Sequence, residues 1–380
     1  MSQIFKKYFL SLLKKIWTQL CRGRIDYTPK LEEKTLNLTT LGFNPFFKEQ
    51  LTEEQCKGKN VGRVMLEHKH SYRVWTENGE WLASVSGAFA FQAFSRTDYP
   101  AVGDFVLVEQ MPGEERAVIH HLFERSSKFV RKMAGREVDE QIVAANVDFV
   151  LLVMSLNADF NVRRLERYIV AAWDSGATPV VVLTKADVCE EVDEFVREVE
   201  SVTFGVDVFV VSAVTGEGLN ELRALLVDGK TAALLGSSGA GKSTLTNALL
   251  YTSQMKVSAI REDDAKGRHT TTHRELVVLP SGACLIDTPG MRELQLWDQS
   301  DSLHTGFADI EELAEGCRFR DCTHKGEPGC AVEGAVDEGR LNSYFKLQRE
   351  LAYMEQKSDA AAKLAEKRKW KQISKSLKKK

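Results

Sequence analysis

The chain has 380 residues, enough for two or three domains that each bury a hydrophobic core. Hydrophobic residues make up 43% of it and charged residues 28%, which is typical of a soluble globular protein. The net charge of −3 conceals two basic ends, and the seven cysteines are an odd number, which argues against a disulfide framework. We therefore expect a reducing compartment, the cytoplasm, and no stable insertion into a membrane.

Residues 1–40 are expected to form a basic N-terminal extension. Apolar residues recur at helical spacing between Ile4 and Leu20, with lysines among them, as in an amphipathic helix that lies on a membrane surface or docks on a partner. The apolar run Tyr8–Leu13 is too short to span a bilayer. A poorly ordered extension is the simpler interpretation, and we assign no function to it.

Residues 41–127 contain short β-rich runs separated by turn signals. Asn78-Gly79 and Pro112-Gly113 each lie between two such runs and indicate hairpins. About five short strands in a segment of this size are typical of a small antiparallel barrel such as an OB-fold, which often binds nucleic acid through a basic, aromatic face. The side chains that either form such a face or fill the barrel core are Tyr72, Arg73, Trp75 and Arg96.

From residue 128 to 300 the pattern changes to alternating strands and helices. The run Val147–Met154 is almost continuously apolar, as a buried parallel strand requires. Similar runs follow at 179–183, 206–211 and 283–286, with helical patterns between them. This alternation predicts an α/β, doubly wound sheet.

A glycine-rich loop follows the apolar run Ala232–Leu235 in this sheet and precedes a helical pattern. This is the strand–loop–helix setting of the phosphate-binding motif G-x-x-x-x-G-K-S. The glycines allow several backbone N–H groups to point at one anion, Lys242 can reach the β- and γ-phosphates, and Ser243 is placed to bind Mg²⁺. The predicted nucleotide-binding loop is Gly236, Ser237, Ser238, Gly239, Ala240, Gly241, Lys242, Ser243 and Thr244.

Two polar segments, each after a strand of this sheet, are candidates for binding the base. Thr184-Lys185-Ala186-Asp187 follows the run 179–183, at an edge where ligands of open α/β sheets bind. The Asp187 carboxylate can accept from the ring N–H and the amine of guanine together, whereas adenine has an acceptor in place of that N–H. Ser212-Ala213 can offer a backbone N–H to the guanine O6. Each signal is weak alone, but with the phosphate loop in the same sheet they favour guanine.

Two further segments are placed to sense the terminal phosphate. Asp287-Thr288-Pro289-Gly290 follows a strand, so Asp287 can hold Mg²⁺ through water and the Gly290 N–H can contact the γ-phosphate. The polar segment 266–273 is a candidate switch that is ordered when a threonine hydroxyl meets Mg²⁺. An ordinary strand or loop is the alternative for that segment.

Residues 301–362 contain three thiols and an imidazole at short spacing. Four such ligands suit a closed tetrahedral Zn²⁺ site, which would be structural because no coordination position stays open. The predicted ligands are Cys317, Cys322, His324 and Cys330. A helical pattern then leads into a basic C-terminal tail, residues 363–380.

The chain resembles the circularly permuted ribosome-assembly GTPases of the RsgA (YjeQ) family. The guanine segments precede the phosphate loop and Asp287–Gly290 follows it, whereas ordinary small GTPases have the phosphate loop first. The zinc segment also has the family's Cys-x₄-Cys-x-His-x₅-Cys spacing. The resemblance begins near Leu41 and implies a circularly permuted P-loop GTPase domain between an N-terminal OB-fold barrel and a C-terminal zinc-binding helical domain.

The resemblance also implies roles for individual residues. It implies that Lys242 contacts phosphates and takes part in catalysis. Guanine would be held by Thr184, Lys185, Asp187, Ser212 and Ala213. Mg²⁺ would be held by Ser243, Asp287 and a switch threonine, which we place at Thr271 with Thr270 and Thr272 as alternatives.

Two positions depart from the common GTPase pattern. Met291 stands where Ras-like proteins have a water-positioning glutamine, so hydrolysis needs another group or a partner. His269 resembles the family's switch histidine and is our candidate for orienting the attacking water, with a purely structural role as the alternative. Thr184 replaces the commoner asparagine and lacks an amide donor, from which we expect weaker nucleotide binding.

The function that the resemblance implies is hydrolysis of GTP to GDP and phosphate during late maturation of the small (30S) ribosomal subunit. The partner would be that subunit and its 16S rRNA, contacted through the barrel, the zinc domain and the basic tail, and it would stimulate turnover. GTP would be the substrate, Mg²⁺ and one structural Zn²⁺ the cofactors, and the protein a monomer. Two alternatives stay open: a P-loop kinase or ATPase without guanine selectivity, and an RNA-binding assembly factor that uses nucleotide only structurally.

Overall fold

The structure of the chain is a computed structural model. The N-terminal extension up to residue 36, the candidate switch 266–273 and the basic tail lie outside the residues that it describes. No helix in the described part is long and apolar enough to cross a lipid bilayer. The described residues are 37–52, 57–68, 71–132, 140–203, 205–251, 275–287 and 300–353.

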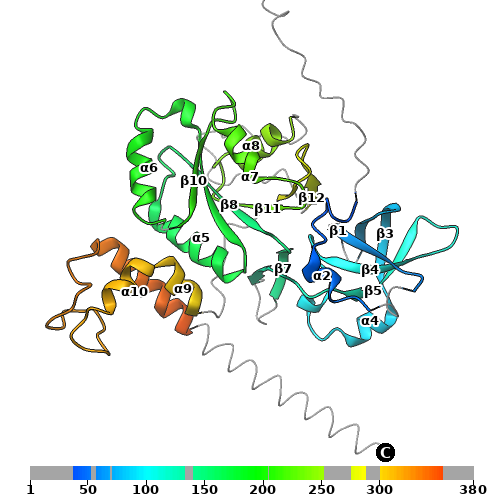
Figure 1. The fold of residues 1–380 in the computed structure, drawn as a ribbon, viewed down its shortest axis with the longest axis horizontal. Coiled ribbons are helices and arrows are strands. Elements are labelled where there is room, and N and C mark those ends of the chain that lie inside the picture. The colour runs from blue at the N-terminus through cyan, green and yellow to red at the C-terminus, as the bar shows by residue number, and fades with distance from the viewer. Residues whose placement is uncertain are drawn as a thin grey trace, which may run out of the picture. The chain divides into compact units, whose positions relative to one another are not determined.

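Five strands close into a small barrel after the short helix α2 (Pro45–Lys48) (Figure 1). Each strand pairs with two others in the cyclic order β1-β2-β3-β5-β4-β1, so the predicted barrel is confirmed. The β3–β5 pair is parallel rather than antiparallel, because the chain returns through helix α4 (Gly87–Gln92) and turn η1 (Arg96–Asp98) before the β4–β5 hairpin. The strands are β1 (Asn60–His68), β2 (Ser71–Thr76), β3 (Gly79–Val85), β4 (Phe105–Gln110) and β5 (Arg116–Leu122).

The structure shows whether the predicted aromatic and basic residues of the barrel fill its core or lie at its surface. Tyr72 is only 1% exposed and packs among apolar side chains, and burial raises the pKa of its phenol. Arg73 forms ion pairs with the carboxylates of Glu80 and Glu275. The indole of Trp75 donates to Glu80 at 3.0 Å. Tyr72 therefore belongs to the core, whereas Arg73, 42% exposed at its side chain, stays at the surface and pairs there with two carboxylates.

The second part of the chain is an α/β sheet in which five strands run parallel in the order β10-β9-β8-β11-β13. Strand β12 is antiparallel to β13 and pairs on its other side with β1 of the barrel, where Glu275 lies opposite Leu66. Nearly every residue of β8, β9 and β11 is buried, which explains their continuous apolar sequences. The strands are β8 (Phe149–Ser155), β9 (Thr178–Thr184), β10 (Asp207–Val211), β11 (Thr231–Leu235), β12 (Glu275–Val278) and β13 (Cys284–Asp287).

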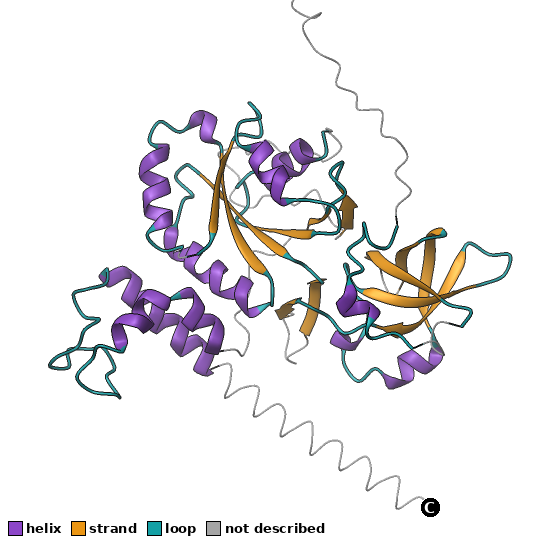
Figure 2. Cartoon of the chain, viewed as in Figure 1, coloured by secondary structure: helices purple, strands orange, loops and turns teal. Residues whose placement is uncertain are grey.

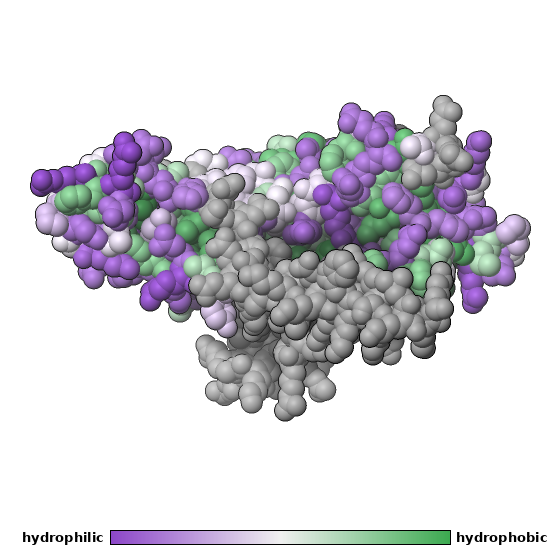
Figure 3. Space-filling model, turned by 90° about the horizontal axis from the view of Figure 1, so that it is seen from below, coloured by the Kyte–Doolittle hydropathy of each residue, from purple (hydrophilic) through white to green (hydrophobic). Residues whose placement is uncertain are grey.

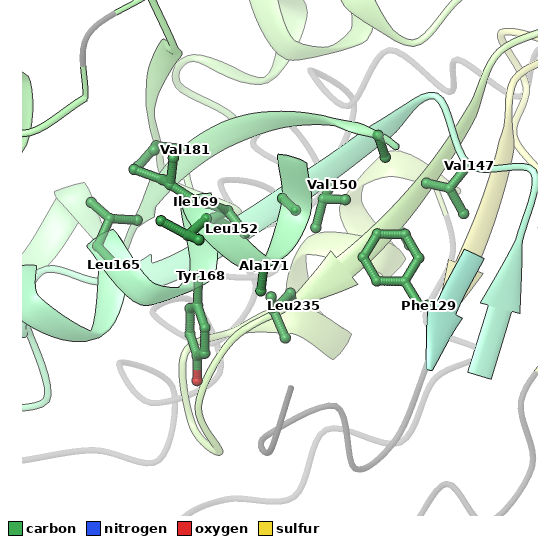
Figure 4. Close-up of a cluster of buried hydrophobic side chains, with 14 of the residues drawn as sticks. Phe129, Val147, Val150, Leu152, Leu165, Tyr168, Ile169, Ala171, Val181 and Leu235 are labelled. Atoms are coloured by element: carbon green, nitrogen blue, oxygen red, sulfur yellow. The ribbon is translucent and has the colours of Figure 1, made fainter. Parts of the chain in front are cut away.

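Helices cover both faces of this sheet (Figures 1 and 2). On one face, α5 (Val162–Asp174) and α6 (Val192–Glu200) contribute to a large hydrophobic cluster, and Figure 4 shows Ile169 of α5 near Leu152 and Val181 of the strands. On the other face, α7 (Leu219–Leu225) and α8 (Lys242–Leu249) pack on alternate residues of the same strands. This arrangement is the doubly wound α/β class predicted from the sequence.

A buried arginine joins the barrel to the α/β sheet. Arg63 of β1 is 1% exposed and donates to the Gly103 carbonyl, the Thr231 hydroxyl and the Asn146 carbonyl at 2.8–3.1 Å, and also to the Leu41 carbonyl. Burial lowers the pKa of its guanidinium. A small hairpin, β6 (Lys128–Lys132) and β7 (Glu140–Ala145), lies between the two parts in the chain and was not predicted.

The C-terminal described region is helical around an irregular segment. Helices α9 (Ser300–Gly306) and α10 (Ala308–Ala314) precede it, residues 338–353 are helical after it, and loops fill the interval (Figure 2). Arg340 is 4% exposed at its side chain and pairs with Glu166 of α5 and Asp309 of α10, which ties this region to the α/β sheet.

On the face drawn in Figure 3, hydrophilic side chains are interspersed with hydrophobic patches.

Candidate nucleotide site

The phosphate loop lies between the end of β11 and the start of α8. Gly239 and Gly241 have φ angles of 80° and 90°, in the left-handed region that favours glycine. Gly236 is required for a different reason, because a Cβ there would lie 2.2 Å from the carbonyl oxygen of Val153 on β8. The loop therefore needs all three glycines to turn tightly into the helix while staying against the neighbouring strand.

Lys242 closes one end of this loop. Its ammonium donates to the carbonyl oxygens of Gly236 at 2.8 Å and Ser237 at 2.6 Å. Burial raises the pKa of Asp287, at the end of β13, and the nearby charge of Lys242 offsets part of that rise. A lysine and a carboxylate thus meet at the carboxyl ends of adjacent strands β11 and β13, an arrangement suited to a phosphate chain and a divalent cation.

The base segments lie at the same edge of the sheet. The hydroxyl of Thr184, which is 3% exposed, donates to the carbonyl of Ala240 in the phosphate loop at 2.6 Å. The hydroxyl of Ser212 donates to Oδ1 of Asp187 at 2.7 Å, which orients the carboxylate. The Ser212–Asp187 contact follows from the β9–β10 register, which places Val211 opposite Thr184. The structure thus brings together the two segments predicted to bind the base, and it joins them to the phosphate loop.

Some predicted positions are described only in part or not at all. Lys185 adopts a left-handed conformation with φ 65°, and Ala213 follows Ser212 directly after β10. His269, Thr271 and Gly290 lie outside the described residues, as does Met291. Their roles stay predictions.

The predicted zinc ligands converge. His324 Nδ1 lies 3.6 Å from the sulfur of Cys317 and 3.4 Å from that of Cys330, and the four ligand atoms, including Cys322 Sγ, all lie within 4.8 Å of one another. The N–H of Ala331 donates to the sulfur of Cys317 and lowers the pKa of that thiol by stabilising the thiolate. Three sulfurs and one imidazole nitrogen at these separations suit a tetrahedral ion of zinc type.

Sequence relatives decide the family. A family model described as the RsgA GTPase matches residues 122–297. A relative from Oceanobacillus iheyensis, named small ribosomal subunit biogenesis GTPase RsgA 1, is 46% identical over 325 residues, which are 84% of this chain and 93% of the relative. One from Lactiplantibacillus plantarum, named small ribosomal subunit biogenesis GTPase RsgA 2, is 48% identical over 84% of this chain and 90% of the relative. The chain belongs to the RsgA family of GTPases.

Membership in the RsgA family confirms the resemblance and makes the chain a GTP hydrolase. Solved structures agree. YjeQ from Thermotoga maritima is 28% identical with a TM-score of 0.58, over 77% of this chain and 99% of that one. YloQ, a circularly permuted GTPase, is 23% identical with a TM-score of 0.56 over 80% of this chain and 98% of that one, and it bears on the fold alone.

A second family model, described as an ABC transporter, matches residues 219–377. That range contains the phosphate loop, a motif that ATPases and GTPases share. It leaves out Thr184, Asp187 and Ser212, the segments that favour guanine. The RsgA match includes them, and the geometry at this edge of the sheet joins them to the loop.

The sequence analysis did not predict one carboxylate that contacts the phosphate loop of this chain, that of Asp159. Asp159 lies in the turn between β8 and α5 and accepts a hydrogen bond from the hydroxyl of Ser237, and Arg164 pairs with the same carboxylate. Its position after a parallel strand, at the same edge as Thr184 and Ser212, was a usable signal. Asp159 belongs to none of the GTPase motifs, so those motifs do not point to it.

Proposed function

We propose that this chain is a GTPase of small ribosomal subunit assembly that binds the subunit late in its maturation and hydrolyses GTP with ribosome-stimulated turnover. Two relatives at 46–48% identity are named small ribosomal subunit biogenesis GTPases and align over more than four fifths of the chain, which supports the proposal. The proposal for this chain rests on one observation. Asp187, Thr184 and Lys242 lie at the same edge of the α/β sheet.

The nucleotide would lie with guanine at Asp187 and its phosphates in the loop. Asp187 accepts from the two donors of guanine, with Lys185 along the base and a backbone N–H of Ala213 at O6. The nucleotide-binding residues we assign are Thr184, Lys185, Asp187, Ser212, Ala213, the loop 236–244, Asp287 and Gly290. The Ser212 hydroxyl supports this assignment, because it holds the Asp187 carboxylate by a 2.7 Å hydrogen bond before any base arrives.

The metal assignments follow from donor chemistry. Ser243, Asp287 and Thr271 would hold Mg²⁺, which when bound neutralises charge on the β- and γ-phosphates. Cys317, Cys322, His324 and Cys330 would hold one structural Zn²⁺. Burial desolvates the Asp287 carboxylate, and among the described residues Lys242 is the charge that opposes this, so a cation bound there would stabilise the carboxylate.

Hydrolysis would depend on the docked state. Lys242 stabilises charge on the phosphates, and His269 orients the attacking water in place of the glutamine that Met291 replaces. Bound GTP orders the segment 266–273, the ordered segment favours the docked form, and hydrolysis releases the protein. The subunit accelerates turnover by supplying or ordering what Met291 lacks.

Contact with 16S rRNA would involve the barrel, the zinc segment and the basic tail 363–380. In the zinc segment, the Arg318 guanidinium lies 5.5 Å from the ring centroid of Phe319, and Phe319 is 44% exposed. An exposed ring beside a cation is suited to stacking on an unpaired base. We place the protein in the cytoplasm, where ribosomal subunits mature, and as a monomer.

Co-sedimentation with purified subunits tests the proposal. We expect binding to small but not large subunits, with a non-hydrolysable GTP analogue and not with GDP, and faster GTP turnover when small subunits are added. Turnover that small subunits leave unchanged would favour an RNA-binding factor that uses nucleotide structurally. Equal affinity for GTP and ATP would favour a P-loop ATPase instead.

A further inference from the structure

The two ends of the phosphate loop can be told apart by their partners. The carbonyl of Ala240 accepts from Thr184, which belongs to the base segment, so the C-terminal part of the loop faces the base. The carbonyl of Ser237 accepts from the ammonium of Lys242, the group that reaches the β- and γ-phosphates. Ser237 therefore lies at the terminal-phosphate end of the loop.

A fixed carboxylate contacts that end. The Ser237 hydroxyl donates to Oδ2 of Asp159, in the turn between β8 and α5. The turn is itself held, because the N–H of Asp159 donates to Oδ1 of Asn157 at 3.1 Å, and the same oxygen lies 2.8 Å from the hydroxyl of buried Ser155. The backbone of Asp159 is thus fixed by its own turn, and Ser237 and Arg164 hold its carboxylate.

Asp159 forms an ion pair with Arg164. Arg164, in the first turn of α5, donates to both carboxylate oxygens of Asp159, at 3.3 Å and 3.0 Å, and to its backbone carbonyl. Its Nε is buried and has no hydrogen-bond partner among the described residues. The guanidinium has five N–H donors, of which Asp159 engages three, so the second N–H of Nη1, on a side chain that is 28% exposed, can donate to a further anion without releasing Asp159.

The two charges act on bound nucleotide in opposite directions. Asp159 repels an anion at the Ser237 end, and Arg164 attracts one. GTP brings more negative charge to this end than GDP does, because only GTP has the γ-phosphate. Given the proposed guanine-nucleotide site, on which this inference rests, we propose that the Asp159–Arg164 ion pair sets the preference between GTP and GDP. Arg164 supplies attraction for the terminal phosphate, while Asp159 positions Ser237 and limits that attraction.

Affinities for GDP and for a non-hydrolysable GTP analogue, titrated by fluorescence with Mg²⁺, test this assignment in the full chain. Arg164→Met should weaken the analogue by about tenfold relative to GDP, equivalent to about 1.4 kcal/mol. Asp159→Asn, which keeps an oxygen acceptor for Ser237, should shift the ratio the other way and favour the analogue. Arg164→Lys keeps the charge and should recover part of the ratio.

Arg167→Met is the matched control, because Arg167 lies on the same helix but pairs with Glu350. It should leave the ratio unchanged. Equal weakening of both nucleotides by Arg164→Met would mean a structural role and would overturn the inference, as would an unchanged ratio in both Arg164→Met and Asp159→Asn. If Arg164→Met does not fold, the direction of the Asp159→Asn shift decides. Wild-type protein that binds neither nucleotide would instead sink the proposed function.

Discussion

The hydroxyl of Thr184 donates a 2.6 Å hydrogen bond to the carbonyl of Ala240, which joins the base segment to the phosphate loop across 56 residues of sequence. Thr184 is buried, and a Cβ on Gly241 would lie 3.4 Å from its hydroxyl oxygen, so the two segments are also in close contact. From the sequence we expected threonine to weaken nucleotide binding because it lacks an amide donor. The hydroxyl nevertheless supplies one donor at the position that connects the two ends of the site.

Thr184→Val tests this connection, because valine keeps the shape and removes the hydroxyl. The Ala240 carbonyl would lose its partner in a buried setting, so we expect GTP and GDP to bind about tenfold more weakly. Thr184→Ser keeps the hydroxyl and serves as the control. Titration of both nucleotides measures the effect, and wild-type affinity in Thr184→Val would show that the hydrogen bond does not support the loop.

Asp187→Asn should change which base is bound. The amide cannot accept from both guanine donors, so we expect GTP affinity to fall by about 100-fold or more. Xanthine has a carbonyl in place of the guanine amine and should gain from the new amide donor. Competition of GTP and XTP for the variant measures the exchange.

Ser212→Ala is the companion variant for that experiment. It removes the hydroxyl that orients Asp187 at 2.7 Å and leaves the carboxylate in place. We expect weaker GTP binding with guanine still preferred. Unchanged GTP preference in Asp187→Asn would mean that the base lies elsewhere.

The parts of the site that sequence predicts well are those whose chemistry imposes a spacing. The phosphate loop needs glycines at set positions, and the structure shows left-handed backbone at Gly239 and Gly241 and a close strand contact at Gly236. The same holds for the three thiols and His324, since one ion limits how far apart its ligands can be. The five-strand barrel followed from short β-rich runs with turn signals between them, and the doubly wound sheet from the alternation of apolar runs and helical patterns.

Contacts between distant segments could not be predicted in this way. Tyr72 and Arg73 alternate on β2, and only the structure shows that Tyr72 enters the core while Arg73 reaches across β1 to Glu275 of β12. Arg63 looks like a surface residue in the sequence, but its partners come from segments far along the chain. Asp159 contacts Ser237 only because parallel strands end at one edge.

Arg63→Met should loosen the junction between the barrel and the α/β sheet. Methionine fills the space but removes the Arg63 donor from the buried carbonyls of Leu41 and Asn146 and from the Thr231 hydroxyl, while the Gly103 carbonyl keeps a hydrogen bond from the Asn146 amide. We expect the free energy of unfolding to fall by roughly 2–5 kcal/mol, as for other buried polar networks that lose a member. Urea unfolding followed by fluorescence measures the loss.

Arg73→Met is the control for the junction, because Arg73 forms an exposed ion pair with Glu275 in the same region. Exposed pairs contribute roughly 0–1 kcal/mol, so this variant should unfold close to wild type. Similar losses in the two variants would show that burial of Arg63 does not matter for stability.

Removal of metal should unfold the C-terminal region without abolishing nucleotide binding. The four predicted ligands lie in an irregular segment between helices, where a bound ion would cross-link the loops. We expect one equivalent of zinc in purified protein by elemental analysis, and loss of that metal and of solubility in Cys322→Ser. Cys189→Ser, at a cysteine outside the cluster, should keep the metal. A full equivalent of zinc in Cys322→Ser would contradict this ligand set, whereas GTP binding should survive because the phosphate loop and Asp187 lie on the α/β sheet.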